Sequence, residues 1–115
     1  MVKTVRSVPH RGLRDWILQR LSAVMIVAYA LWLMATLVCE TNLTFAEWHH
    51  LFSLASVKIA TILFLAALII HAWIGIWTIL TDYVKPILLR GVLYLVIVFM
   101  LIAFFIWGLL ILGSV

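Results

Sequence analysis

The sequence has little charge. Only 10% of its 115 residues are charged, 68% are hydrophobic, and the mean hydropathy is +1.29. A soluble domain has about a quarter of its residues charged and about half apolar. The sequence therefore lacks the polar side chains that would cover its apolar surface in water. This excludes a soluble globular domain and predicts a protein embedded in lipid.

Cysteine and acidic residues are also scarce. Cys39 is the single cysteine, which excludes an intrachain disulfide and a metal site built from several cysteines. Four acidic residues face eight Lys and Arg, giving a formal net charge of +4. Most of that excess precedes the first apolar segment. It indicates membrane topology and anionic lipid headgroups, and not a nucleic-acid partner.

Three long stretches contain no Asp, Glu, Lys or Arg: residues 21–38, 59–80 and 91–115. A helix needs roughly 20 apolar residues to cross the hydrocarbon core, and backbone amides in lipid must bond within their own segment. We therefore expect an all-α membrane protein whose single transmembrane domain occupies residues 1–115. Its three spans are expected at about 16–38, 57–81 and 89–113. Pro86 is the expected helix breaker between the second and third spans.

The distribution of Lys and Arg predicts the orientation. They gather before Leu21, and Lys85 and Arg90 lie in the second loop, whereas the first loop has only Lys58 at its edge. Three spans put the N-terminus and the second loop on the same side of the membrane. The positive-inside rule assigns that side to the cytoplasm.

His71 is the ionisable side chain of the second segment that needs an explanation. It precedes Leu80 by nine residues, which places it about 13 to 14 Å from the cytoplasmic end, near the bilayer midplane. An imidazole at that depth must find a partner. One interpretation is a hydrogen bond to a Ser or Thr on a neighbouring helix. The other is a metal or haem ligand, since neutral imidazole is the commonest such ligand.

A stripe of small and polar residues follows His71 along one face of the expected helix. Gly75, Thr78 and Asp82 lie four, seven and eleven residues further on, with Trp73 on the opposite side. A glycine one turn from the histidine leaves space for a flat macrocycle, although small residues also let helices pack closely. The stripe favours a ligand site that runs from mid-membrane to the cytoplasmic interface.

Two other positions allow two interpretations each. Arg20 is either a snorkelling arginine that helps to fix topology or a guanidinium that holds an anion such as a haem propionate. Tyr83 is either an interfacial anchor or a phenol that donates to a ligand carbonyl, with Asp82 orienting it. His49 and His50 are interpreted as interfacial residues of the outer loop, because two adjacent histidines would need further metal ligands from elsewhere.

Two motifs resemble a known family. The run from His71 to Pro86, HAWIGIWTILTDYVKP, closely resembles the signature of the succinate dehydrogenase hydrophobic membrane-anchor subunit, the D chain of the bacterial enzyme. Residues 12–23, GLRDWILQRLSA, are similar to the same family at the start of its first span. Chain length, three spans and topology also agree, so the resemblance covers essentially the whole sequence.

The resemblance implies roles for particular residues. The family's haem-ligating histidine falls on His71, which would be one axial ligand of the haem iron, the second coming from the other anchor subunit, the C chain. The ubiquinone-site tyrosine falls on Tyr83, with Asp82 beside it, and Arg20 matches the basic residue near the haem propionates. The N-terminal ten residues match no motif of the family.

The implied complex oxidises succinate at a flavoprotein subunit and passes electrons through an iron–sulfur subunit to ubiquinone. This chain would supply a haem b ligand, part of the ubiquinone site and a docking surface in the bacterial inner membrane. FAD and the iron–sulfur clusters would belong to other subunits, so the chain is not an enzyme alone. Two alternatives remain: a fumarate reductase anchor, and a small oligomeric transporter. The latter is disfavoured because no span contains a carboxylate to couple to protons.

Overall fold

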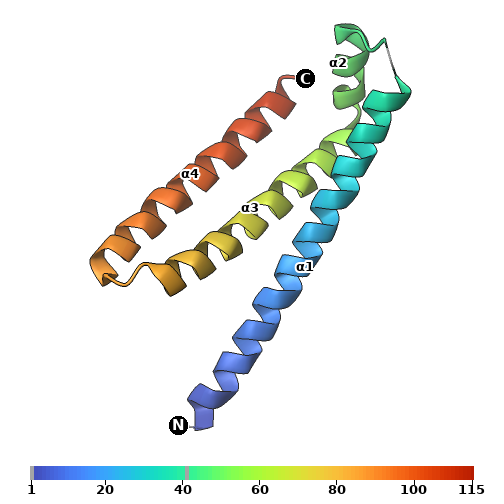
Figure 1. Ribbon diagram of the computed structural model, residues 1–115. Coiled ribbons are helices and arrows are strands. Elements are labelled where there is room, and N and C mark those ends of the chain that lie inside the picture. The colour runs from blue at the N-terminus through green and yellow to red at the C-terminus, as the bar shows by residue number, and fades with distance from the viewer. Residues whose placement is uncertain (1, 41) are drawn as a thin grey trace.

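The computed structural model describes residues 2–40 and 42–115, and it describes the side chains of residues 12–40 and 42–115. This part of the chain is all-helical. The helices are α1 (Val2–Cys39), α2 (Phe45–Ser53), α3 (Ala55–Tyr83) and α4 (Ile87–Gly113) (Figure 1). The expected fold class, an all-α membrane protein with three long apolar helices, is confirmed.

The three long helices are able to cross a membrane. Gly12–Cys39, Ala55–Tyr83 and Ile87–Gly113 have hydropathies of 2.2, 2.4 and 3.1. Helix α3 ends at Tyr83 and α4 begins at Ile87, directly after Pro86 in extended conformation. Proline lacks the N–H that a continuing helix would need, and its ring disfavours helical geometry in the preceding residue. Pro86 therefore separates the two helices, as expected from the sequence.

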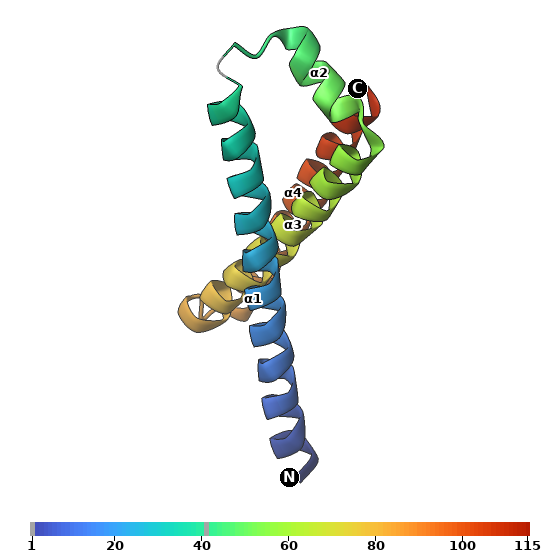
Figure 2. The same ribbon diagram turned by 90° about the vertical axis from the view of Figure 1, so that its right-hand side faces the viewer.

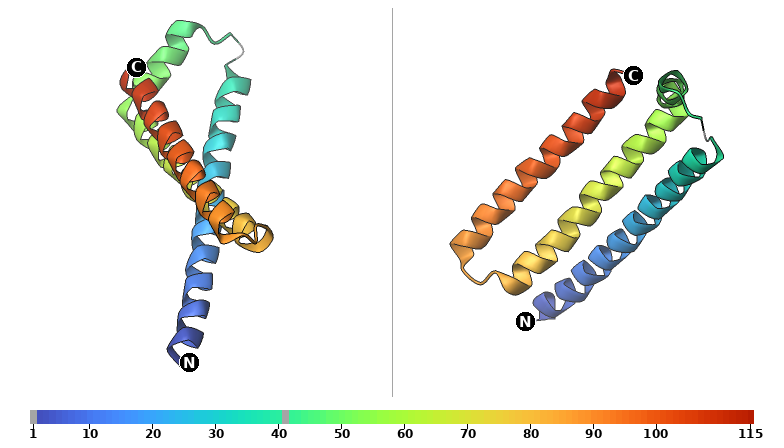
Figure 3. Two further views of the ribbon diagram at one scale, coloured as in Figure 1. Left: turned by 90° about the vertical axis from the view of Figure 1, so that its left-hand side faces the viewer. Right: turned by 45° about the horizontal axis from the view of Figure 1, so that its top comes forward.

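Helix α3 lies between the other two long helices. Both α1 and α4 pack against it, so the three form a row in which α1 and α4 lie on opposite sides of α3 (Figures 1 and 3). Seen from the side, α1 crosses α3 and the two then diverge towards α2 (Figure 2). Helix α2 and the loop before it bridge the separated ends.

Helix α2 was not expected from the sequence, which was interpreted as a polar loop at this point. Its N-terminus is capped by Thr44, whose side chain accepts from the Glu47 N–H while the Glu47 carboxylate accepts from the Thr44 N–H, both at 3.3 Å. This reciprocal capping box satisfies two backbone donors that a helix start leaves free. The Thr-x-x-Glu spacing was a visible signal for a helix start.

Few side chains are buried within the chain. Among the described residues the buried ones are Val57, Ala67, Leu80, Leu112, Ser22 and Thr61. Two of the six are polar, and both make hydrogen bonds between α1 and α3. Most of the apolar surface faces outwards, as is expected of helices that meet lipid or other membrane subunits. In that environment, hydrogen bonds and close packing hold helices together because lipid provides little hydrophobic drive.

The contact between α3 and α4 combines one polar pair with one close approach. The hydroxyl groups of Thr81 and Tyr94 lie 2.8 Å apart, and the Tyr94 ring meets Trp73 edge-on with centroids 5.9 Å apart. Further along, a Cβ placed on Gly108 would lie 2.7 Å from Leu65 Cδ1. Gly108 therefore lets α4 approach α3 closely at this point.

Candidate functional site

His71 lies where α1 crosses α3. Its Nδ1 is 3.1 Å from the Oγ of Ser22 on α1, and Ser22 is only 4% exposed. The Ser22 hydroxyl also lies 3.0 Å from the backbone oxygen of Gln19, one turn earlier in its own helix. The expected hydrogen bond between His71 and a Ser or Thr on a neighbouring helix is thus present. It occupies one of the two ring nitrogens of His71.

The other ring nitrogen, Nε2, has no hydrogen-bond partner among the described side chains. The imidazole is partly exposed at the surface of the helix row, as are its neighbours through Trp77. A neutral imidazole bound through Nδ1 retains Nε2 as a metal ligand. The geometry of His71 is therefore compatible both with a structural hydrogen bond and with a role as a ligand.

A glycine and a buried side-chain amide lie near His71. A Cβ added to Gly75, one turn further along α3, would meet only the Gln19 Nε2 within 4 Å, at 3.9 Å. Packing within this chain therefore does not require glycine at this position. The Gln19 Oε1 is buried without a hydrogen-bond partner in the described part of the chain. Residue 75 thus presents no side chain to a ligand, and the nearby Gln19 amide has an oxygen without a partner among the described residues.

A metal ion at His71 would need ligands from another molecule. Within residues 12–40 and 42–115, no group of three or more His, Cys, Asp and Glu side chains is close enough to hold a metal ion. His49 and His50 lie on α2, at the far end of α3 from Tyr83 (Figure 1). His71 is the described histidine that lies at the crossing of the long helices.

Arg20 lies on α1, two residues before Ser22, and its side chain is exposed. Its guanidinium carbon is 5.5 Å from the ring centroid of Trp16. The structure records no hydrogen bond or ion pair between Arg20 and another described side chain. Its guanidinium donors are thus available to an anion, and the cation–π contact with Trp16 holds the group near the start of the first span.

Asp82 and Tyr83 lie at the C-terminal end of α3, which is the same end of the molecule as the N-terminal part of α1 (Figure 1). Tyr83 is 79% exposed, and Asp82 is exposed as well. Neither side chain makes a hydrogen bond within the described part of the chain, so the expected contact between Asp82 and the phenol is not present here. The intervening Thr78 hydroxyl donates to the Ile74 carbonyl of its own helix at 2.8 Å. The stripe that follows His71 along α3 therefore ends in two side chains, Asp82 and Tyr83, that have no hydrogen-bond partner among the described residues.

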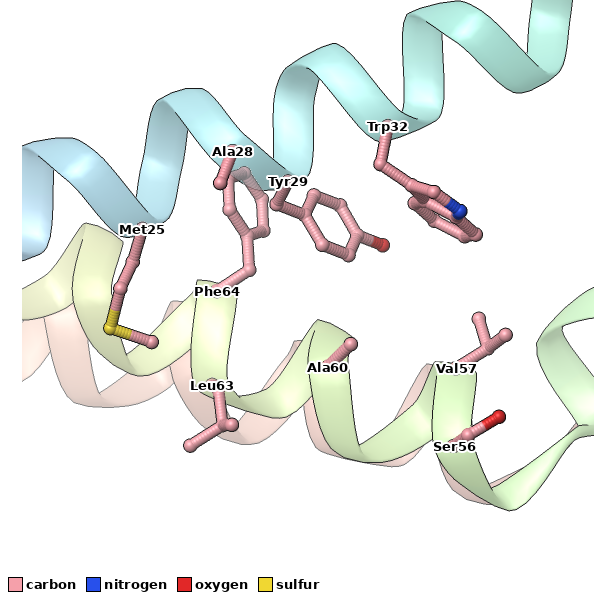
Figure 4. Close-up of a pocket in the computed structure, with 9 residues that line it drawn as sticks. All are labelled: Met25, Ala28, Tyr29, Trp32, Ser56, Val57, Ala60, Leu63 and Phe64. Atoms are coloured by element: carbon pink, nitrogen blue, oxygen red, sulfur yellow. The ribbon is translucent and has the colours of Figure 1, made fainter.

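Two grooves between α1 and α3 were not expected from the sequence. One, of about 380 Å³, lies near the N-terminal end of the row and is lined by Arg14, Asp15, Trp73 and Trp77 among others. The other, of about 440 Å³, opens where the helices diverge (Figure 4). In it the Tyr29 and Phe64 rings stack with centroids 4.2 Å apart, beside Ala28 and Ala60. Sequence gives no signal for such grooves because they depend on the crossing of two helices.

These observations define a helical membrane protein with three potential spans and a partly exposed imidazole where two of them cross. A family model described as the succinate dehydrogenase/fumarate reductase transmembrane subunit matches residues 3–107. The chain belongs to this family. It is also 38% identical over 98 residues to the succinate dehydrogenase hydrophobic membrane anchor subunit of Coxiella burnetii (strain RSA 493 / Nine Mile phase I), covering 85% of each chain. The family resemblance inferred from the two motifs is confirmed, and the chain is a multi-pass membrane anchor subunit.

Proposed function

We propose that the chain is the anchor of a succinate:ubiquinone oxidoreductase that binds haem b through His71 and forms part of the ubiquinone site at Tyr83. The observation that carries the haem assignment is the state of the His71 ring, with Nδ1 bonded to Ser22 and Nε2 free of described partners. The position of His71 between long apolar helices supports it, because an ionisable residue at that depth is a functional candidate.

The residues around His71 would share the binding of haem. His71 would supply one axial nitrogen, Gly75 would leave room for the ring, and Arg20 would pair with a propionate. When bound, haem b supplies one-electron redox chemistry to the site. Because the described residues hold no group of three or more His, Cys, Asp and Glu side chains that could bind a metal ion, we propose that the second axial ligand comes from the C chain.

The ubiquinone site is proposed at the end of α3. The Tyr83 phenol is exposed and free of described partners, so its O–H is available to donate to a quinone carbonyl. Asp82 precedes it and would orient the bound quinone or a neighbouring cation. On a helix, His71 and Tyr83 are separated by at most about 18 Å. Both sites would then lie in one continuous stretch of α3.

We propose that the other partners are an iron–sulfur subunit and a flavoprotein subunit. These subunits would hold the iron–sulfur clusters and the FAD. They would dock on the membrane face at which α3 ends with Tyr83. The basic N-terminal residues and the second loop, with Lys85 and Arg90, assign that side to the cytoplasm by the positive-inside rule. The membrane would be the bacterial inner membrane.

A direct test is to purify the complex through a tag on this chain and to record reduced-minus-oxidised spectra of the parent, His71→Ala and His50→Ala. His50 is an exposed histidine of α2 and serves as the matched control. We expect flavin, iron–sulfur and second anchor subunits to co-purify, and b-type haem bands that are lost or shifted in His71→Ala alone. Unchanged bands in an assembled His71→Ala complex would contradict the haem assignment.

The family also includes fumarate reductase subunits. The rates of succinate oxidation with ubiquinone and of fumarate reduction with a low-potential quinol separate the two activities in the same preparation. A complex that favours fumarate reduction and shows no haem bands would support the second function. Transport activity that persists without any partner subunit would instead support the transporter interpretation.

A further inference from the structure

We infer that Ser22 is a positioning residue that fixes the tautomer of His71, so that Nε2 faces the metal with its lone pair free. This inference rests on the proposed haem function for its consequence, but its physical basis lies within the chain. It concerns three atoms: the Ser22 Oγ, the backbone oxygen of Gln19 and the His71 Nδ1.

The single hydrogen of the Ser22 hydroxyl decides the arrangement. The Oγ lies 3.0 Å from the Gln19 backbone oxygen and 3.1 Å from the His71 Nδ1. A carbonyl oxygen only accepts, whereas a hydroxyl donates one hydrogen and accepts through its lone pairs. If the hydrogen points to Gln19, the Ser22 oxygen accepts from an Nδ1–H, and both contacts are hydrogen bonds. The opposite arrangement leaves two oxygens 3.0 Å apart with no hydrogen between them.

The preferred arrangement is therefore a chain in which His71 Nδ1–H donates to Ser22 and Ser22 donates to the Gln19 carbonyl. Neutral imidazole carries one N–H, so Nε2 then has a free lone pair. Successive hydrogen bonds polarise one another, which strengthens the bond that the imidazole donates. The protein thus presents a ligating nitrogen before any metal is bound.

The burial of Ser22 makes this chain of hydrogen bonds persistent. Ser22 is 4% exposed, so water has little access to its hydroxyl. An unpaired hydroxyl or imidazole N–H between two apolar helices would lose free energy without compensation. The persistent bond holds the imidazole ring in one orientation.

A hydrogen bond to the second nitrogen of a ligating histidine raises its basicity and fixes its orientation, and losing such a partner lowers metal affinity by about 10- to 100-fold. We therefore expect Ser22→Ala to weaken haem binding by about that factor. We also expect a higher haem midpoint potential, because a less basic imidazole stabilises the oxidised iron less well. Ser22→Thr retains a hydroxyl that bonds the preceding turn, and it should preserve both properties.

The experiment compares haem content and midpoint potential in purified complexes of the parent, Ser22→Ala and Ser22→Thr, with Ser56→Ala as control. Ser56 is an exposed serine of α3 that lies away from His71. A loss of affinity and a raised potential in Ser22→Ala, with the parent values restored in Ser22→Thr, would support the inference. A Ser22→Ala complex with the haem affinity and the midpoint potential of the parent would overturn the inference.

The tautomer itself is measured on the full-length chain in lipid without haem, labelled with ¹⁵N-histidine. The chain has four histidines, and the His71 signals are those lost in His71→Gln. We expect a protonated Nδ1 and an unprotonated Nε2 in the parent chain. In Ser22→Ala we expect a changed ratio between the two neutral tautomers of His71. A protonated Nε2 in the parent chain would refute the inference. If the parent complex has no haem bands, the proposed function fails, while the ¹⁵N spectrum still decides whether Ser22 sets the tautomer.

Discussion

The hydroxyl groups of Tyr29 and Thr61 lie 2.7 Å apart and join α1 to α3 beside the groove in Figure 4. Thr61 donates its own hydrogen to the Val57 carbonyl at 2.8 Å, so Tyr29 is the donor of this bond. Tyr29 lies about two turns beyond Ser22 on the same face of α1. Among the described side chains, two hydrogen bonds thus join the two helices, one at the crossing and one where they begin to diverge.

Tyr29→Phe should weaken this second bond without disturbing the stacked rings. Phe64 would still stack on the new ring, and the Thr61 hydroxyl would still bond its own helix. We expect a loss of about 0.6 kcal/mol, the average for hydrogen bonds between membrane helices, and no more than about 1.7 kcal/mol. Thermal unfolding of the purified complex measures this. A loss far above that range would show that the hydroxyl also contacts another subunit.

Gly108→Ala should weaken the packing of α4 against α3. The added Cβ would lie 2.7 Å from Leu65 Cδ1, so the leucine or the helix must move. Overpacking of this kind costs up to about 1–3 kcal/mol, and the helix-propensity gain of about 0.5–1 kcal/mol that Gly→Ala brings offsets part of this cost. Gly91→Ala is the matched control on the same helix, because nothing lies within 4 Å of its Cβ position. The control should gain about 0.5–1 kcal/mol from helix propensity.

Equal unfolding temperatures for Gly108→Ala and Gly91→Ala would contradict the role assigned to Gly108. They would show that the Leu65 side chain moves aside without cost. Measuring both variants in the same detergent removes differences that arise from the micelle.

Tyr83→Phe should lower the rate of ubiquinone reduction and leave succinate oxidation with a soluble dye unchanged. The reason is that the phenol O–H is the proposed donor to the quinone carbonyl, while dye reduction requires only the soluble subunits. Tyr94→Phe is the control, since that hydroxyl is bonded to Thr81 at 2.8 Å. An equal loss of both activities in Tyr83→Phe would indicate faulty assembly and count against a quinone role.

Arg20→Gln should lower haem affinity by about tenfold or more, because a hydrogen bond to a charged group contributes about 1.5–3 kcal/mol. The spectrum of the haem that remains bound should keep its parent form, since the axial ligand is unchanged. Arg14→Gln is the control, because Arg14 lies 3.7 Å from Asp15 in an exposed ion pair. Haem titration of both variants measures the effect. Equal haem affinities of the two variants would show that Arg20 does not bind haem and would support its interpretation as a residue that fixes topology.

The sequence predicted the long helices more reliably than the contacts between them. Three stretches without charge, and Pro86 between the last two, were sufficient because hydrocarbon excludes both charges and unpaired backbone groups. Helix α2 was missed, although Thr44 and Glu47 carry the spacing of a capping box. Its nine residues are too few to cross the membrane, so a search for long apolar stretches gives no signal for this helix.

The pairing of Ser22 with His71 was only partly predictable. A hydroxyl partner on a neighbouring helix was one interpretation of His71, but the sequence did not say which hydroxyl. Ser22, Tyr29 and Thr36 recur at seven-residue spacing on one face of α1, and this spacing is the signal that could have shown how α1 is rotated against α3. Arg20 is the more conspicuous side chain, yet it is Ser22 that the rotation of α1 turns towards the histidine.

The arrangement of α1, α3 and α4 as an open row has a consequence for any flat ligand at His71. Such a ligand has two faces, and helices arranged in a single layer can shield only one of them. We therefore expect each anchor chain to form half of a shell around the haem, so that deleting either chain would expose the remaining half to lipid. Under the proposed function, neither anchor chain alone would then retain haem.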